Sequence, residues 1–213
     1  MYQFLNTMNT HRNIARIPII MAAATMLLAA CRKEETSGPS GNAVLTEHDK
    51  TDLLFMLEEE KLARDTYTAL EALWSSTQFV NIKSSEQTHM DRIADLLNTY
   101  DVPYVILPEG EFANATLQAL FDQFMVDGAQ SELHALRIGA TIEDLDIVDL
   151  QERMDATTTT SVDRVYGKLQ CGSRNHLRSF VDAINSAGGS YAPQYLEQDA
   201  YDAILAGDHE SCG

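Results

Sequence analysis

The sequence predicts an all-α protein: a four-helix bundle with one long crossover between helices 2 and 3 that carries a short extra helix. Four long stretches repeat apolar residues at steps of three and four, which is the spacing of one buried helix face. No stretch of any length shows the alternation of a half-buried strand. The connection between the second and third stretches, residues 101–130, is long, and a single long middle connection distinguishes this topology from a simple up-down bundle.

The first two helices are expected to form an antiparallel pair. The first begins at Thr46, a favourable N-cap with Asp49 three residues later, and runs to about Trp74. The second covers about residues 81–100 and ends before Pro103, because a proline disfavours the helical conformation at the residue that precedes it. Their apolar faces carry Leu53, Leu57, Glu60, Tyr67, Leu70 and Trp74 in the first, and Ile82, Glu86, His89, Ile93, Leu96 and Tyr100 in the second.

The remaining helices follow the long connection. A short helix is expected over residues 114–126, ended at Gly128. The third long helix covers about residues 131–154 and the fourth about residues 162–186, with a threonine-rich loop over residues 156–161. The faces of these two helices carry Leu136, Ala140, Glu143, Ile147, Leu150 and Met154, and Val162, Val165, Leu169, His176 and Phe180. The tail is expected to fold back as a loop and a short helix.

The N-terminus has the pattern of a targeting segment. Arg12 and Arg16 make a basic start, and residues 17–30 are almost wholly apolar but too short to span a membrane comfortably. The segment ends Leu28-Ala29-Ala30-Cys31, which resembles a bacterial lipobox. In such signals the chain is cut before the cysteine, which then carries acyl chains such as palmitate. The alternative is an ordinary signal peptide with an incidental cysteine.

This pattern predicts three parts of the chain. Residues 1–30 are expected to be a lipoprotein signal peptide, residues 31–44 a lipidated Cys31 with a flexible tether rich in small and polar residues, and residues 45–213 the helical domain. The protein would then lie outside the cytoplasm, anchored to a bacterial membrane in the periplasm or at the cell surface. The sequence does not distinguish these two locations.

Composition excludes one class of partner. The chain has 213 residues, of which 45% are hydrophobic, enough for one domain with an apolar core. The formal net charge of −17 argues against nucleic acid as a partner, because binding to phosphates needs clustered lysine and arginine. The acidity is compatible with cation binding, although most acidic residues are expected to form a solvated surface.

Two further cysteines, Cys171 and Cys212, lie in the fourth long helix and near the C-terminus. Outside the cytoplasm they can form a disulfide, which would hold the tail against the helices. Two free thiols, or a site for a soft metal, are the alternatives. No C-x-x-C spacing supports the metal site.

Each long helix places side chains that can bind a metal on its apolar face. Glu86-Gln87-Thr88-His89 is an E-x-x-H unit, whose Glu and His point the same way on a helix. A carboxylate and an imidazole on a buried face must be paired, neutralised or bound to a metal, because burial of a lone charge is costly. The candidate metal ligands are Glu60, Glu86, His89, Glu143, Asp146 and His176.

These motifs carry a resemblance to known proteins. Glu60 followed by Ala63, Arg64 and Tyr67 resembles the first helix of rubrerythrin-type ferritin-like proteins, and Glu86-x-x-His89 resembles their second helix. The stretches 79–86, 138–150, 172–178 and 191–196 resemble the DUF2202 family, in the right order along about residues 46–205.

The resemblance implies a ferritin-like bundle with metal ligands at Glu60, Glu86, His89, Glu143 and His176. The usual fourth helix carries a second E-x-x-H, but Ser173 stands at its Glu position here. We expect Asp146 to replace that carboxylate; otherwise the site would be mononuclear or weak.

Two functions of different classes follow. The first is a lipid-anchored protein that binds one or two ions of iron or manganese, with zinc as an alternative, and acts as an oxidase, a peroxide scavenger or a metal binder. The second is a non-catalytic surface module with a degenerate site, suggested by Ser173. In the second case Arg64, Arg92 or Arg178 would fill the centre of the bundle. The sequence leaves the metal, the substrate and the oligomeric state open.

Overall fold

The structure, a computed structural model, describes residues 45–212. The expected signal peptide, Cys31 and tether lie outside these residues. The described part of the chain forms six α-helices and no strand, which confirms the all-α prediction. The helices are α1 (Glu47–Trp74), α2 (Thr77–Thr99), α3 (Ala115–Gly128), α4 (Glu132–Ala156), α5 (Thr160–Ser186) and α6 (Gln198–Ala206).

The helix termini follow the expected caps in most places. Thr46 and Asp49 form a reciprocal capping box at the start of α1, and the side chains of Asn114 and Ser131 cap α3 and α4. The second helix begins at Thr77, four residues earlier than predicted, because a left-handed Ser75 (φ 52°) ends α1 and allows a two-residue turn. The loop before α5 is likewise shorter than expected.

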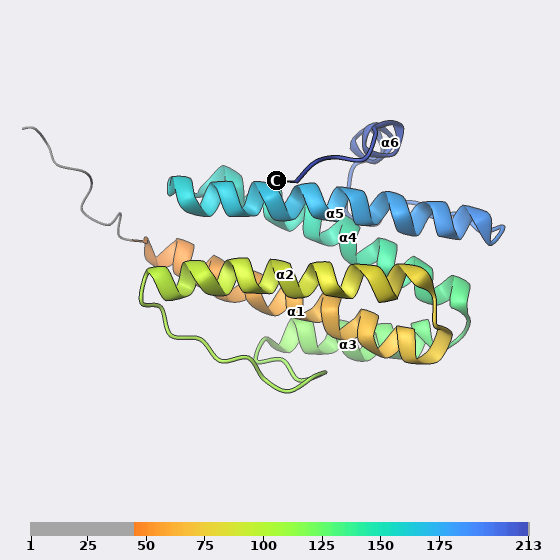
Figure 1. Ribbon diagram of the computed structural model, residues 1–213, viewed down its shortest axis with the longest axis horizontal. Helices are drawn as coiled ribbons and strands as arrows, with labels where there is room; N and C mark the ends of the chain where they lie inside the picture. The colour runs from red at the N-terminus through yellow and green to blue at the C-terminus, as the bar shows by residue number, and fades with distance from the viewer. Residues whose placement is uncertain (1–44, 213) are drawn as a thin grey trace, which may run out of the picture. The chain divides into compact units, whose positions relative to one another are not determined.

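Four long helices pack in two pairs (Figure 1). α1 lies against α2 and α4 lies against α5, and the pairs meet through contacts of α2 with α5 and of α1 with α4. α3, in the crossover between α2 and α4, packs on both α1 and α4, so that α1 is covered on two sides. α6 contacts α5.

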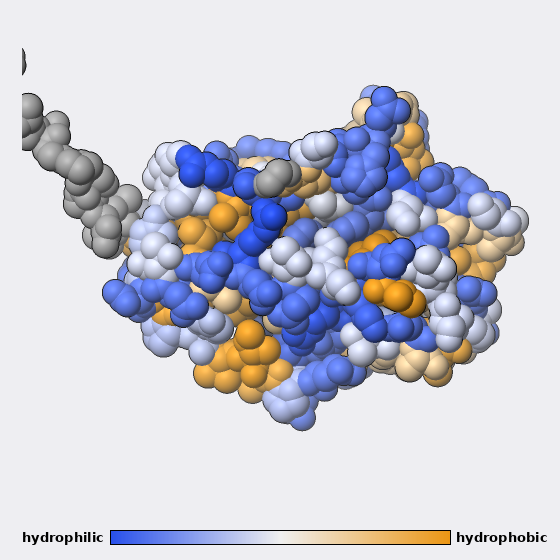
Figure 2. Space-filling view, in the orientation of Figure 1, coloured by the Kyte–Doolittle hydropathy of each residue, from blue (hydrophilic) through white to orange (hydrophobic). Residues whose placement is uncertain are grey.

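The apolar core is divided into two clusters along the helices. One contains Tyr67, Phe79 and Phe180 with the residues that α3 covers, and the other contains Leu53, Ile93 and their neighbours. Figure 2 shows that hydrophilic residues cover most of the face formed by α2, α5 and the C-terminal tail, with apolar residues in separate patches. Among the described helices, none is long and apolar enough to cross a membrane.

Candidate metal centre

A layer of polar side chains separates the two apolar clusters. Three of the long helices, α1, α2 and α5, change from one cluster to the other at this level, and α4 changes just after it, between Ile147 and Leu150. α1, for example, passes from Leu57 in one cluster to Leu62 in the other, with Glu60 between them. The residues of this polar layer are Glu60 on α1, Glu86 and His89 on α2, Glu143 and Asp146 on α4, and Ser173 and His176 on α5. All are buried except His176, whose side chain is 12% exposed.

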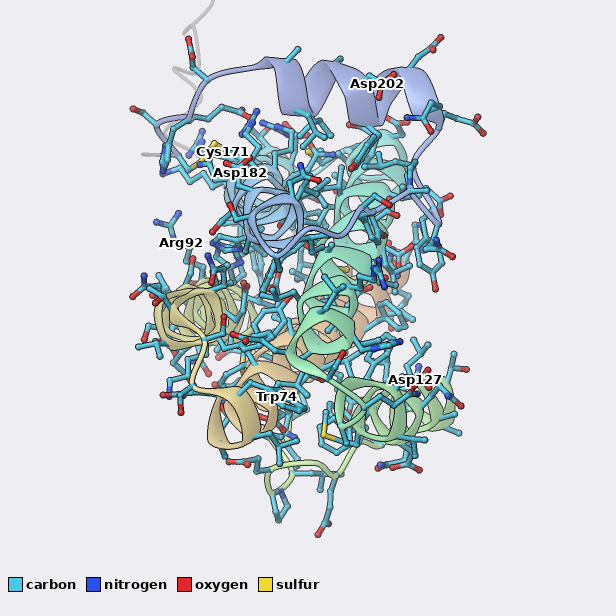
Figure 3. All side chains as sticks on the ribbon, turned by 90° about the vertical axis from the view of Figure 1, so that its right-hand side faces the viewer. Trp74, Arg92, Asp127, Cys171, Asp182 and Asp202 are labelled. Atoms are coloured by element: carbon cyan, nitrogen blue, oxygen red, sulfur yellow. A yellow bond between two sulfur atoms is a disulfide. The ribbon has the colours of Figure 1, made fainter. Side chains whose placement is uncertain are left out.

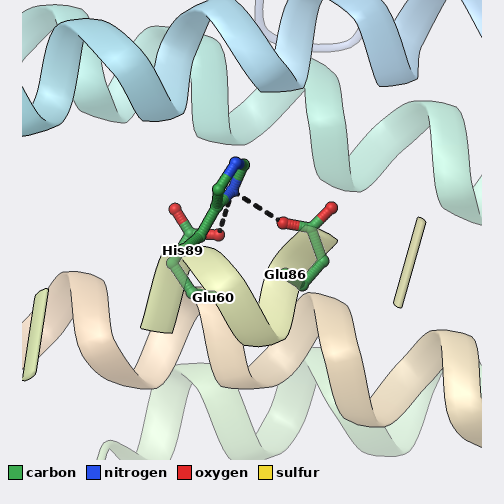
Figure 4. Close-up of side chains that lie close together, drawn as sticks. All are labelled: Glu60, Glu86 and His89. Atoms are coloured by element: carbon green, nitrogen blue, oxygen red, sulfur yellow. Dashed lines mark hydrogen bonds and ion pairs between the residues drawn. The ribbon is translucent and has the colours of Figure 1, made fainter. Parts of the chain in front are cut away.

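Three of these side chains converge between α1 and α2. The Nδ1 atom of His89 lies 3.1 Å from Oε2 of Glu60 and 2.9 Å from Oε2 of Glu86 (Figure 4). The E-x-x-H spacing produces this contact, because residues three apart on a helix share a face. One oxygen or nitrogen from each of these three residues lies within 4.8 Å of the others, which is compatible with a shared metal ion.

A second group of three converges between α2, α4 and α5. The Nδ1 atom of His176 lies 2.8 Å from Oε1 of Glu86 and 3.4 Å from Oε2 of Glu143. Glu86 therefore belongs to both groups, with one oxygen facing each imidazole. The rings of His89 and His176 are stacked with their centroids 5.7 Å apart. Glu86 would therefore offer one oxygen to each of the two groups if both held a metal ion.

Asp146 and Ser173 meet beside these groups. The hydroxyl of Ser173 donates a hydrogen bond of 2.5 Å to Oδ2 of Asp146. Ser173 is three residues before His176, so the Asp146 carboxylate reaches the region that a glutamate at position 173 would occupy. Asp146 is in neither group of three, although it lies in the same buried layer.

Several atoms of the polar layer are fully buried without a hydrogen bond. They include Oε1 of Glu60, Oε1 of Glu86, Oδ1 of Asp146 and Nδ1 of His176. Oε1 of Glu86 and Nδ1 of His176 lie 2.8 Å apart, which is an ion-pair distance, but their alignment is not that of a hydrogen bond. Buried polar atoms are normally satisfied, and a lone pair without a donor costs about 1–3 kcal/mol. Unsatisfied oxygen and nitrogen lone pairs that face one another fit a cation.

Three of the four acids of this layer, Glu60, Glu143 and Asp146, hold protons more tightly than ordinary acids. Burial raises the pKa of Glu60 to about 7, although His89 opposes the shift. Burial also raises the pKa of Glu143, and it raises that of Asp146 strongly. Carboxylates crowded in a dry interior repel each other and disfavour the charged form.

The imidazoles supply compensating charge. Burial alone would lower the pKa of His176, but Glu86 and Glu143 outweigh it and raise this pKa to about 10. The pKa of His89 is raised for the same reason, by Glu60 and Glu86. Burial would raise the pKa of Glu86, yet the two histidines bring it below its ordinary value. A divalent cation would supply the positive charge that these groups otherwise take from protons.

Two residues around the layer fix its geometry. Tyr67 donates a hydrogen bond of 2.6 Å to Oε1 of Glu143. Gly172 faces His89: a Cβ atom at this position would lie 2.7 Å from Nε2 of the imidazole. The absence of a side chain at Gly172 therefore gives the ring its place.

No arginine in the described residues fills the centre. Arg64 binds Asp65 and Gln87, and Arg178 binds Glu210 and the carbonyl of Ile204. Arg92 lines a cavity beside the centre.

Sequence reasoning missed Glu59. This residue is 2% exposed, and both of its carboxylate oxygens are buried without a hydrogen-bond partner. Burial raises its pKa well above the ordinary value, and the charges of Asp146 and Asp149 add to the shift. The single apolar face assumed for the first helix hid this residue.

The tail is held against α5. Cys171 and Cys212 form a disulfide with an S–S distance of 2.07 Å. Arg174 and Arg178 both pair with Glu210, at 2.5 and 2.8 Å. These contacts hold the last residues beside the polar layer, since Cys171 precedes Gly172.

Comparison with known proteins places the chain in a family. Residues 49–208 match the family described as "Uncharacterized protein domain (DUF2202)". The chain belongs to the DUF2202 family. A curated relative, "Uncharacterized protein MJ0754" of Methanocaldococcus jannaschii, is 42% identical to this chain over 168 residues, which cover 78% of this chain and 91% of that protein.

A solved structure agrees with the fold. The crystal structure of hypothetical protein MJ0754 from Methanococcus jannaschii matches with a TM-score of 0.78 and 40% sequence identity. The match covers 81% of this chain and 100% of that chain.

Proposed function

We propose that this DUF2202 protein is a ferritin-like metal-binding protein whose polar layer holds one or two ions of iron or manganese. The observation that carries the proposal is the pair of three-residue groups that share Glu86. Four carboxylates and two imidazoles form the layer: Glu60, Glu86, Glu143 and Asp146 with His89 and His176. Di-iron and di-manganese bundles use the same numbers of each, and oxygen and imidazole donors suit these metals, with zinc as an alternative.

The arrangement of the helices supports the ferritin-like assignment. A short turn joins α1 to α2, a short loop joins α4 to α5, and the long crossover containing α3 joins the pairs. This is a bundle topology with a single long connection, in which ligands from facing helices meet in the core. Asp146 takes the place of the carboxylate that Ser173 lacks, which supports retention of a dinuclear site.

A bound iron or manganese ion would supply redox chemistry with dioxygen or peroxide, and the residues around the layer would hold its ligands in place. Tyr67 orients Glu143 through its hydroxyl, and Gly172 leaves space for His89. The apolar clusters on both sides exclude bulk water from the carboxylates. The matched acids and imidazoles hold protons until a cation displaces them.

We also propose that the protein works outside the cytoplasm on a bacterial membrane, in the periplasm or at the cell surface. The lipobox-like sequence before Cys31 supports a lipid anchor at that residue. The Cys171–Cys212 disulfide fits an oxidising compartment. Incorporation of labelled palmitate, lost in Cys31→Ser, tests the anchor.

The competing function is a surface interaction or structural module without metal. Its supporting observation is that Glu86 and Glu60 lie within ion-pair distance of histidines, which can compensate their charge without a cation. This alternative predicts that chelators leave the melting temperature unchanged, whereas a bound metal stabilises the fold by mass action.

Metal analysis of the domain decides between these functions. The domain (residues 44–213), purified without chelator or affinity metal and then reconstituted, should bind about two iron or manganese ions per chain if the site is dinuclear, as expected for four carboxylates and two imidazoles. One ion would indicate a mononuclear site built on Glu60, Glu86 and His89. No bound metal after reconstitution would contradict the proposal.

A matched pair of variants makes the analysis specific. The double variant Glu86→Gln/His89→Gln should lose the metal, because Glu86 belongs to both groups. The control Glu152→Gln/His48→Gln changes the same residue types at exposed positions and should retain it. Equal metal content in both variants would exclude the polar layer as the site.

A further inference from the structure

A cavity of about 390 Å³ lies beside the polar layer, between α2, α5 and the C-terminal tail. α2 contributes Thr88 and Arg92, α5 contributes Lys168 and Asn175, and the tail contributes His209. Figure 3 shows Arg92 extending from α2 toward the side of α5 that carries Cys171. The cavity has hydrogen-bond donors on all three walls.

The charge of this cavity differs from that of the molecule. Arg92 and Lys168 are half-buried on its walls, and neither forms an ion pair with another residue in the range 45–212. Its one acidic lining residue, Glu210, is already paired with Arg174 and Arg178. In a chain of net charge −17, two cations without carboxylate partners face the same partly open cavity.

The cavity also reaches the candidate metal centre. His89 and His176 line it, and so does Gly172, which has no side chain to separate the cavity from the His89 ring. Both imidazoles direct Nδ1 at the carboxylates of the polar layer, so a ligand in the cavity meets the outer side of these two rings. Arg92 and Lys168 therefore flank a route from solvent to the polar layer.

We propose that this cavity is a binding site for a small free oxyanion, such as inorganic phosphate or a short carboxylate. Arg92 and Lys168 provide the charge, and the side chains of Thr88, Asn175 and His209 provide further hydrogen-bonding groups. The role of such an anion as a substrate or ligand of the metal rests on the proposed function above. Its binding in the cavity does not, because no metal is required for it.

The dimensions and walls favour a free anion over a large molecule. Since each water occupies about 30 Å³ in the liquid, the volume holds on the order of a dozen waters, or one small anion with part of its hydration shell. The tail forms the outer wall, and it is fixed to α5 by the Cys171–Cys212 disulfide and by Glu210. The site is therefore formed before the ligand arrives.

Titration of the metal-free domain with inorganic phosphate tests the proposal. At constant ionic strength, backbone amide resonances of Thr88, Arg92, Lys168 and Asn175 should shift in a saturable manner. A parallel titration with acetate separates carboxylates from phosphate, and acetamide is the neutral control for acetate. No saturable shift at the cavity with either anion, or equal shifts with acetate and acetamide and none with phosphate, would overturn the proposal.

Charge-matched variants distinguish the cavity from general attraction of anions. Arg92→Gln/Lys168→Gln should weaken binding of the anion at least tenfold. Arg164→Gln/Lys50→Gln removes the same charge outside the cavity lining and should leave the affinity unchanged. An equal loss in both variants would contradict a specific site. The metal content is measured separately. Failure of anion binding would therefore leave the proposed metal function standing, and absence of bound metal would leave the proposed anion site standing.

Discussion

At the scale of single residues, the position of His89 depends on a neighbour without a side chain. We predict that Gly172→Ala displaces the His89 ring, because the added Cβ would lie 2.7 Å from Nε2. The expected result is a 10- to 100-fold loss of metal affinity, roughly the effect of changing groups that orient metal ligands. Competition with a chromogenic chelator measures this affinity.

Gly167 on the same helix provides the control. A Cβ there would lie 3.7 Å from the Met154 sulfur, an ordinary contact. Gly167→Ala should keep the metal affinity and raise the free energy of unfolding by about 0.5–1 kcal/mol, since alanine favours helix over glycine. Unchanged metal affinity in Gly172→Ala would show that the His89 ring position does not matter for metal binding.

Residue spacing predicted part of the polar layer. The E-x-x-H unit indicated that Glu86 and His89 face the same side, and the structure places both beside Glu60. Spacing alone does not reveal that Ser173 meets Asp146, because that contact joins two helices and depends on their relative register.

At the scale of elements, α3 explains what the sequence concealed. A helix with one apolar face should be polar elsewhere, but α1 is covered by both its bundle neighbours and α3. Lys61 is consequently buried and donates to the carboxylate of Asp65 and to the carbonyls of Pro108 and Glu111 in the crossover. The charged run at residues 58–61 is therefore partly internal. Lys61 is buried against the crossover, whereas Glu59 is buried on the side of α1 that faces Asp146 and Asp149 of α4.

The tail is the element whose attachment is easiest to test. We predict that reduction of Cys171–Cys212 lowers the free energy of unfolding by about 2–4 kcal/mol, because the bond closes a long loop in the unfolded chain. Guanidinium unfolding with and without reductant measures the change. The helical circular dichroism at 25 °C should persist, since α1–α5 pack against one another without the bond.

The double variant Cys171→Ser/Cys212→Ser serves as the control for reduction. It should match the reduced protein in stability and show no response to reductant. A response of equal size in the variant and in the natural chain would mean that the reductant acts elsewhere.

At the scale of the whole molecule, the polar layer lies between two apolar clusters, where repulsion among its ionised carboxylates would destabilise the fold without compensating protons or cations. Periodicity predicted the order of the long helices and most of their ends, because caps and breakers are local. The two-sided cover of α1 and the cavity under the tail could not be predicted, since both depend on contacts between distant segments.

The same enclosed layer makes the stability of the metal-free domain depend on pH. Glu60 has a pKa near 7 when folded against an ordinary 4.5, so its contribution is complete below pH 4.5 and is lost as pH rises through 7. His176 has a folded pKa near 10 against 6.5, so its contribution is complete below 6.5 and is lost as pH rises toward 10. The pKa of Glu86 is lowered by folding, so its contribution to stability is lost as pH falls below 4.5 and does not change between pH 6 and pH 9.

We therefore predict that the melting temperature of the metal-free domain falls between pH 6 and pH 9. Each proton held more tightly by the folded state changes the free energy of unfolding by about 1.4 kcal/mol per pH unit. Iron or manganese should reverse the trend, because the ion replaces these protons and binds more strongly as they leave. The difference in melting temperature between the metal-loaded and metal-free domain should increase from pH 6 to pH 9. In Glu60→Gln this difference should be smaller than in the natural chain. A metal-free melting temperature that rises with pH would show that the buried acids are already ionised and compensated without a cation.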